Sequence, residues 1–308
     1  MSLLYKAQTR FLFHAHIKIK ISVFYEDRLF DVLFGILEEI DRKYNSYQPG
    51  SYIDRINKHA GHFVEVDGET IRLLRRVISL SDCLDGDFDP TIMPLIRLWG
   101  FYRENQRTVP SREEIGRVKP LINYKNIIIE GNRVRIGEGQ EIITGSFIKA
   151  YAVDCLTDRM EKLGINDAII NAGGSTIRAI NNEGHPFWEI IVREPVDDSI
   201  LFRLNIGNQC YSTSSQAKTF VEIGGRRYGH ILDPKSGYSS ANKEVGIVSE
   251  DCLMGDILST GLYNQTAGGF LEKMEFLSSF YPIEGFMIDE NDNKVFTKGF
   301  NQYIKGEK

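Results

Sequence analysis

The sequence contains little cysteine and little tryptophan. Its 308 residues include four cysteines and two tryptophans. Because the cysteines are far apart and form no Cys-x-x-Cys pair, neither a zinc site nor a thioredoxin-like redox pair is expected, and no disulfide framework is indicated. The four residues are Cys83, Cys155, Cys210 and Cys252.

Long apolar runs and an excess of basic charge are also missing. No run approaches the ~20 apolar residues that a membrane-spanning helix needs. The 37 basic and 42 acidic side chains give a formal charge of −5, so no broad positive field exists to hold nucleic acid, and that class is excluded. No signal peptide is expected, because Lys6, Arg10, Lys18 and Lys20 interrupt any apolar core near the start. The sequence assigns no compartment.

The remaining composition is that of an ordinary globular protein, with 42% hydrophobic and 26% charged residues. Alternating or apolar patterns predict strands, and apolar residues at helical spacing predict helices. These elements do not follow a regular βαβ rhythm, so we expect one large α+β domain over residues 1–308. The expected strands are 17–24, 167–171, 188–193 and 245–248, with a two-stranded hairpin in 126–136, and the expected helices are 29–47, 70–84, 147–163, 253–263 and 269–279.

Residues 85–91 form the first of four polar, glycine-containing segments that could carry chemistry. Three acids suggest a calcium loop, but its sixth position is Pro90 instead of glycine and its twelfth is Ile96 instead of glutamate. The simpler interpretation is a helix exit and a tight turn, with Asp89 capping the next segment.

The second segment, residues 171–175, joins an apolar run to paired glycines. Such a turn can bring backbone N–H groups close to a ligand, often a phosphate. A hairpin turn is the more frequent explanation of the same pattern.

The third segment, residues 229–237, places His230 beside an Asp-Pro-Lys-Ser-Gly turn. A histidine titrates near neutral pH and can act as a general base. A lone histidine is more often structural.

The fourth segment contains Asp256 and Thr260, which share one face of a predicted helix. A carboxylate and a hydroxyl are hard oxygen ligands that suit Mg²⁺. The alternative is that the Thr260 hydroxyl bonds back to the carbonyl of Asp256.

Taken in this order, the segments resemble the ApbE-type flavin transferases, which are FAD:protein FMN transferases. The resemblance runs from about residue 11 to 295. The stretches that carry it are 40–47, 51–57, 86–91, 94–101, 149–154, 171–174, 212–214, 230–234 and 256–260.

The resemblance implies an α+β fold with a mixed, mostly antiparallel sheet and flanking helices. It also implies a Mg²⁺-dependent transfer of FMN from FAD to a threonine or serine hydroxyl of an acceptor protein, releasing AMP. Asp256 and Thr260, with the backbone carbonyl of Ser146, would bind the metal, and His230 and Asp256 would be catalytic. The expected contacts to the flavin nucleotide are Tyr47, Gly86, Asp87, Phe88, Lys149, Gly173, Gly174, Thr213 and Ile231.

Three positions depart from the family pattern. Residues 142–143 are Ile-Ile where the family has an acid that contacts adenine, Ala150 replaces a glycine, and residues 214–216 are Ser-Ser-Gln instead of Ser-Gly-Asp. These differences keep three alternatives open. The chain could bind FAD without transferring FMN, hydrolyse FAD to FMN and AMP with Mg²⁺, or keep the fold alone as a scaffold.

Overall fold

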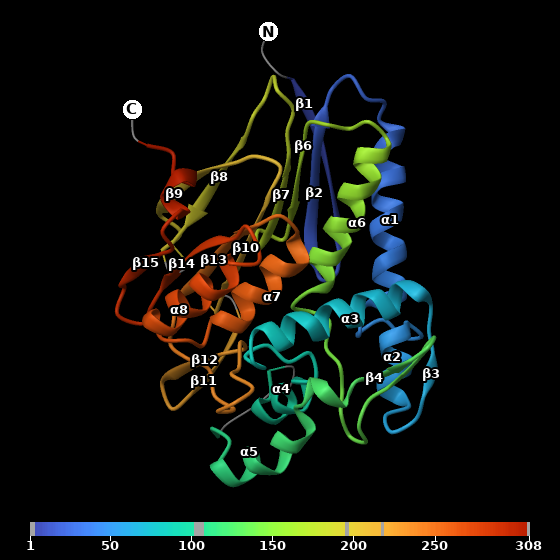
Figure 1. Cartoon of the computed structure of the whole chain (residues 1–308), viewed down its shortest axis with the longest axis vertical. Helices are drawn as coiled ribbons and strands as arrows, with labels where there is room; N and C mark the ends of the chain where they lie inside the picture. Colours follow the sequence, from blue (N-terminus) through green and yellow to red (C-terminus); the bar gives the residue numbers. More distant parts are fainter. Residues whose placement is uncertain (1–3, 102–107, 195–196, 217–218, 307–308) are drawn as a thin grey trace.

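An eight-stranded sheet forms the centre of the computed structural model, which describes residues 4–101, 108–194, 197–216 and 219–306 (Figure 1). Each hydrogen-bonded pair of neighbouring strands in this sheet is antiparallel. The predicted α+β class and the mostly antiparallel sheet are therefore confirmed. The strands in spatial order are β1 (Tyr5–Leu12), β2 (Ala15–Ser22), β6 (Ala168–Ala172), β7 (Thr176–Ile180), β10 (Cys210–Ser215), β13 (Glu244–Ser249), β14 (Glu284–Ile288) and β15 (Lys294–Phe296).

Helices cover one face of this sheet and form the largest hydrophobic core with it. The alternation in β2 places Ile17, Ile19 and Ile21 in that core, as its period of two predicts. The amphipathic helix α1 contributes Leu33 and Leu37 to the same core. The covering helices are α1 (Arg28–Tyr44), α3 (Gly68–Cys83), α6 (Ile148–Lys162), α7 (Cys252–Leu262) and α8 (Ala267–Ser278).

The ribbon of β8 (Trp188–Arg193) and β9 (Ile200–Ile206) forms a separate core on the opposite side of the sheet. Trp188, Ile190 and Val192 alternate along β8 as buried residues, with exposed residues between them. They pack with Tyr211 and Phe286 of the sheet. The sheet is therefore covered on both faces.

Two smaller clusters complete the molecule. One surrounds α2 (Tyr52–Lys58) and a three-stranded sheet of β3 (Val64–Glu65), β5 (Arg133–Arg135) and β4 (Ile128–Glu130). The other joins α4 (Met93–Trp99), α5 (Arg112–Val118), and the hairpin of β11 (Phe220–Ile223) and β12 (Arg226–Gly229). Short 3₁₀ helices are η1 (Lys119–Leu121), η2 (Tyr124–Asn126) and η3 (Phe300–Tyr303).

The helices and strands expected from periodicity are present within a few residues of their predicted bounds. The predicted hairpin in 126–136 is formed by β4 and β5, with Gly131 at a positive φ in the turn. Strand β10 was not predicted, because its Cys-Tyr-Ser-Thr-Ser-Ser run shows neither alternation nor an apolar stretch. The prediction also lacks the edge strands β1 and β15, the strands β3, β7, β9 and β14, the β11–β12 hairpin and the helices α2, α4 and α5.

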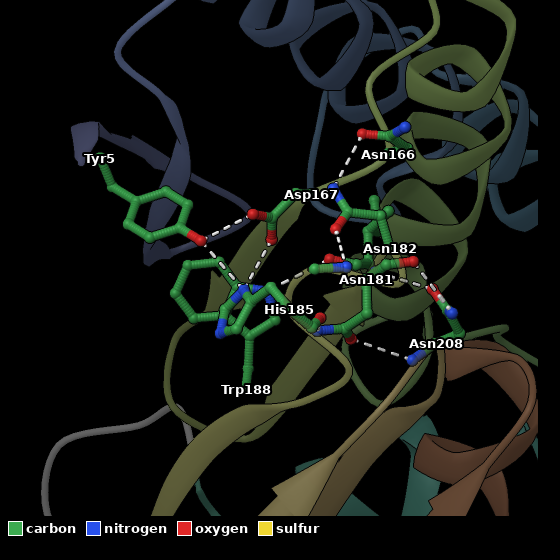
Figure 2. A network of polar contacts seen from close by, with 10 residues as sticks. Tyr5, Asn166, Asp167, Asn181, Asn182, His185, Trp188 and Asn208 are labelled. Atoms are coloured by element: carbon green, nitrogen blue, oxygen red, sulfur yellow. Dashed lines mark hydrogen bonds and ion pairs between the residues drawn. The ribbon is translucent and has the colours of Figure 1, made fainter. Parts of the chain in front are cut away.

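A polar network fixes β1 at one end of the sheet (Figure 2). Tyr5 Oη donates to Asp167 Oδ2 at 2.6 Å, and His185 Nδ1 lies 2.9 Å from Asp167 Oδ1. Trp188 packs against both rings. These contacts join three segments that are distant in the sequence, and they keep the edge strand in register.

One expectation about cysteine is wrong. Cys210 and Cys252 form a disulfide, with their Cα atoms 5.2 Å apart. Cys210 begins β10 and Cys252 begins α7, and these two elements pack together although the residues are 42 positions apart. Sequence spacing gave no sign of the pair because their proximity depends on how α7 packs on the sheet.

In the part of the chain that the structure describes, no helix combines the length and the apolar character needed to cross a membrane.

Candidate active site

A large cavity collects nearly all of the residues that the sequence singled out. Its volume is about 1130 Å³, slightly above the ~300–1,000 Å³ that is usual for small-molecule sites. The polar segments around 87–89, 171–175, 230–234 and 256–260 all contribute to its wall. The predicted site residues that line it are Tyr47, Asp87, Phe88, Ser146, Lys149, Gly173, Gly174, Thr213, His230, Ile231, Asp256 and Thr260.

Asp256 is a buried acid of this cavity, with 6% of the residue exposed. Thr176 Oγ1 lies 2.9 Å from both carboxylate oxygens and donates to them. Burial raises the pKa of Asp256 to about 6, whereas the charge of Lys149 and hydrogen bonds from Ser212 and Thr176 oppose that shift. The carboxylate is therefore ionised above about pH 6 and can attract a cation.

Thr260 lies one helical turn after Asp256 on α7 and also faces the cavity. Its hydroxyl forms a hydrogen bond with Ser214 Oγ at 3.2 Å. The bond back to the carbonyl of Asp256 is made by Ser259 Oγ instead, at 3.1 Å. The shared helix face therefore presents both oxygens to the cavity.

This donor set fits Mg²⁺ on chemical grounds. Asp256 supplies a carboxylate, Thr260 a hydroxyl, and the loop before α6 brings Ser146 to the same wall. Mg²⁺ usually takes one or two carboxylates and completes its coordination with water or phosphate oxygens. Among the described residues, no group of three or more His, Cys, Asp or Glu side chains could hold a metal, so a cation here would depend on Asp256 for its protein charge.

Lys149 stands in the first turn of α6 and lines the cavity. Its positive charge lowers the pKa of both Asp256 and His230. One cation therefore lies within electrostatic reach of the proposed metal ligand and of the candidate base. A lysine in that position can act on a phosphate as a point charge.

His230 follows β12 and borders the cavity beside Ile231. Its Nδ1 lies 3.1 Å from the carbonyl oxygen of Thr219. Because a carbonyl can only accept, Nδ1 carries the proton, and the lone pair of the neutral ring is on Nε2. Burial, aided by Lys149, lowers the pKa of His230 below 6.5. The ring is therefore neutral at pH 7 and suited to accept a proton.

The paired glycines form the turn between β6 and β7, where both have positive φ. The N–H of Gly173 donates to the carbonyl of His16 at 3.0 Å, and the N–H of Gly174 donates to Asn171 Oδ1 at 2.8 Å. The two amides are already used within the protein, so the structure supports the hairpin interpretation over a phosphate cradle. Both glycines still border the cavity.

The segment after α3 also differs in detail from expectation. Gly86 does not line the cavity; its N–H donates to the carbonyl of Ser81, and its φ of 75° makes the turn. The Asp87 carboxylate contacts Lys235 and Lys273, each at 2.5 Å. Asp87 thus holds the 233–237 turn near the cavity, and Asp87, Phe88 and Asp89 all line it.

The position of α7 depends on residues to which the sequence assigned no role. The two carboxylate oxygens of Asp154 accept the N–H groups of Cys252 and Leu253, each at 2.8 Å, at the start of the helix. A Cβ on Gly255 would lie 2.7 Å from the hydroxyl oxygens of Ser212 and Ser249. Close contact between α7 and the sheet therefore sets where Asp256 stands.

Two further residues were also missed: Thr176, which begins β7 and donates to Asp256, and Glu244, which opens β13 and lines the cavity. Thr213, a predicted ligand contact, donates to Glu244 Oε1 at 2.7 Å. The acid at the start of a fully buried strand was the available signal for Glu244. Its partner on β10 could not be inferred without the strand order.

The chain is similar to known proteins in sequence and in structure. A family profile described as the ApbE family matches residues 13–278. Among similar sequences, the FAD:protein FMN transferase of Vibrio cholerae is 29% identical over 235 residues, which cover 74% of this chain and 70% of the relative. The FAD:protein FMN transferase of Haemophilus influenzae is 24% identical and covers 88% of this chain and 81% of the relative.

Solved structures show the same architecture. The ApbE protein of Thermotoga maritima superposes with a TM-score of 0.89 at 25% identity, covering 98% of this chain and all of that one. The apo flavinyl transferase ApbE of Pseudomonas stutzeri gives a TM-score of 0.82 at 26% identity, covering 99% and 98% of the two chains. With the profile matching most of its length and this fold around the cavity, the chain belongs to the ApbE family.

Proposed function

We propose that this protein transfers the FMN part of FAD to a threonine or serine hydroxyl of an acceptor protein and releases AMP, with Mg²⁺ as the metal. The observation that carries this proposal is the gathering of Asp256, Thr260, Lys149 and His230 around one cavity. They come from three separate parts of the sequence. A carboxylate, a hydroxyl, a cation and a neutral base are the groups that phosphoryl transfer requires.

The reaction forms a bond between the acceptor oxygen and the phosphorus of FMN. It breaks the bond between that phosphorus and the bridging oxygen of the pyrophosphate, and AMP leaves with the electron pair. His230 Nε2 takes the proton of the acceptor hydroxyl, because the carbonyl of Thr219 fixes the other ring nitrogen as a donor. Lys149 offsets negative charge on the phosphates.

Asp256 and Thr260, with the carbonyl of Ser146, would hold Mg²⁺. The ion supplies neutralisation of the charge on the pyrophosphate. Thr176 keeps the Asp256 carboxylate in place through its hydroxyl. The disulfide between Cys210 and Cys252 ties the helix that carries both ligands to β10.

The flavin nucleotide would contact Tyr47, Phe88 and Ile231, which all line the cavity. Phe88 is buried and packs against Phe147, so its ring is already fixed before a ligand arrives. A contact with a fixed ring costs less side-chain entropy than one with a mobile ring.

The test is mass spectrometry of an acceptor protein after incubation with this protein, FAD and Mg²⁺. The acceptor modified by the Vibrio cholerae relative is a suitable probe, and that relative is the positive control. We expect an added mass of one FMN on a threonine or serine, together with free AMP. No modification, while the control reaction proceeds, would argue against transfer.

One observation favours a second candidate, a protein that binds FAD without transferring FMN. Ile143 lines the cavity where the family pattern has an acid that contacts adenine, and its N–H is used by the carbonyl of Pro90 at 2.8 Å. Retention of FAD without acceptor modification would support this candidate. Free FMN and AMP appearing without any acceptor would instead indicate a pyrophosphatase.

A further inference from the structure

Glu244 is a buried acid of the cavity that the proposed reaction leaves without a task. The residue opens β13, is 4% exposed and lines the cavity. Its Oε1 accepts from Thr213 Oγ1 at 2.7 Å and more weakly from Tyr211 Oη at 3.5 Å. In the part of the chain that the structure describes, Oε2 has no hydrogen-bond partner.

An acid in this position is unfavourable for the empty protein. Burial raises the pKa of Glu244 to about 7, and the nearby charge of Glu194 adds to that effect. A buried polar atom without a partner costs free energy that a hydrophobic residue in the same place would avoid. The pattern is typical of a group that completes its hydrogen bonds with a ligand.

The surroundings of Glu244 indicate which ligand chemistry fits. Ile177, Ile191 and Tyr211 line the same cavity as apolar or aromatic side chains. Apolar and aromatic walls suit a heterocyclic ring, and a carboxylate oxygen suits an N–H on its edge. Glu194 and Asp198 also border the cavity, but the contacts that the structure gives Glu244 are to the hydroxyl groups of Thr213 and Tyr211, so a ring N–H is a better match than a cation.

We propose that Glu244 is a specificity residue that accepts, at Oε2, a hydrogen bond from an N–H group of a heterocyclic ring of the bound dinucleotide. This inference rests on FAD being the ligand, as proposed above. FAD carries two rings with such a group, the isoalloxazine with its imide N–H and the adenine with its amino group. Separate binding measurements with FMN and with AMP distinguish which of the two rings contacts Glu244.

The Glu244→Gln variant tests the hydrogen bond with little change in volume. If the amide oxygen keeps the bond from Thr213, the amide nitrogen stands where Oε2 was and presents a donor to the donor on the ring. At pH 8, where the carboxylate with its pKa of about 7 is ionised, both Glu244→Gln and Glu244→Ala should then bind FAD at least about tenfold more weakly, because the lost bond is charge-assisted. Glu284→Gln is the matched control, since Glu284 lies on the neighbouring strand β14 and does not line the cavity.

The measurement is isothermal titration of FAD, FMN and AMP into wild type and variants, with melting curves to verify folding. Loss of FMN affinity without loss of AMP affinity places the flavin ring at Glu244, and the reverse places adenine there; both results support the proposal. FAD affinities of both Glu244 variants within twofold of wild type would overturn it, as would an equal loss in Glu284→Gln. If wild type binds none of the three nucleotides, the proposed function itself fails, and this inference fails with it.

Discussion

The buried carboxyl of Glu244 should make the stability of the protein depend on pH in a way that one substitution removes. Its pKa is about 7 in the folded protein, against an ordinary value of 4.5. The folded state therefore holds a proton that the unfolded state releases at lower pH. Protonation of Glu244 therefore contributes fully to the stability of the folded protein below pH 4.5, and this contribution is lost as the pH rises to about 7.

The expected size follows from the shift. The difference of 2.5 between the two pKa values, at about 1.36 kcal/mol for each pKa unit, corresponds to about 3 kcal/mol. Glutamine cannot titrate, so Glu244→Gln should escape this loss. The free energy of unfolding of the variant minus that of wild type should rise by up to about 3 kcal/mol between pH 4 and pH 8.

The assay is urea unfolding at several pH values, followed by tryptophan fluorescence, with wild type and variant measured side by side. Titrating groups common to both proteins cancel in the difference. Glu194→Gln is a useful second variant, because the charge of Glu194 helps to raise the pKa of Glu244. Removing that charge should make the loss of stability between pH 4 and pH 8 smaller than in wild type. A difference that stays constant from pH 4 to pH 8 would refute the reasoning, since it would mean that Glu244 ionises as readily in the folded protein as in the unfolded chain.

Three further predictions concern the proposed site. Asp256→Asn removes the carboxylate proposed for Mg²⁺ and should reduce metal-dependent FMN transfer at least about 100-fold. Its circular dichroism melting curve should stay close to that of wild type. Unchanged turnover would contradict the metal assignment. His230→Gln should lower kcat by about 10²–10⁴ with little change in the Kd for FAD. Because burial lowers the pKa of the histidine below 6.5, the acid limb of kcat/KM in wild type should have its midpoint below pH 6.5. A midpoint above that value would point to another base. Gly255→Ala would place a Cβ 2.7 Å from the hydroxyl oxygen of Ser212 and should lower the free energy of unfolding in urea by about 1–3 kcal/mol. Gly268→Ala is the control, because its Cβ meets no atom within 4 Å. Equal stability of the two variants would show that α7 is not tightly packed.

Local features of this protein were predictable because backbone geometry fixes them within a few residues. The 3.6-residue period identified α1 and α6, and the period of two identified β2. The same local rule placed Asp256 and Thr260 on one helix face, and the structure brings both to the cavity. His230 was a candidate because it stands beside a turn, where a side chain can reach a ligand.

The sequence by itself thus determined the fold class, most helices and the residue types available for chemistry. Tertiary structure decided which of them meet. Thr176 contacts Asp256 across 80 residues, Thr213 contacts Glu244 across 31, and Cys210 joins Cys252 across 42. These contacts depend on strand order and on how closely α7 packs against the sheet. Such pairings are set by the sum of many long-range interactions, whereas spacing along one helix or strand is set by the backbone alone.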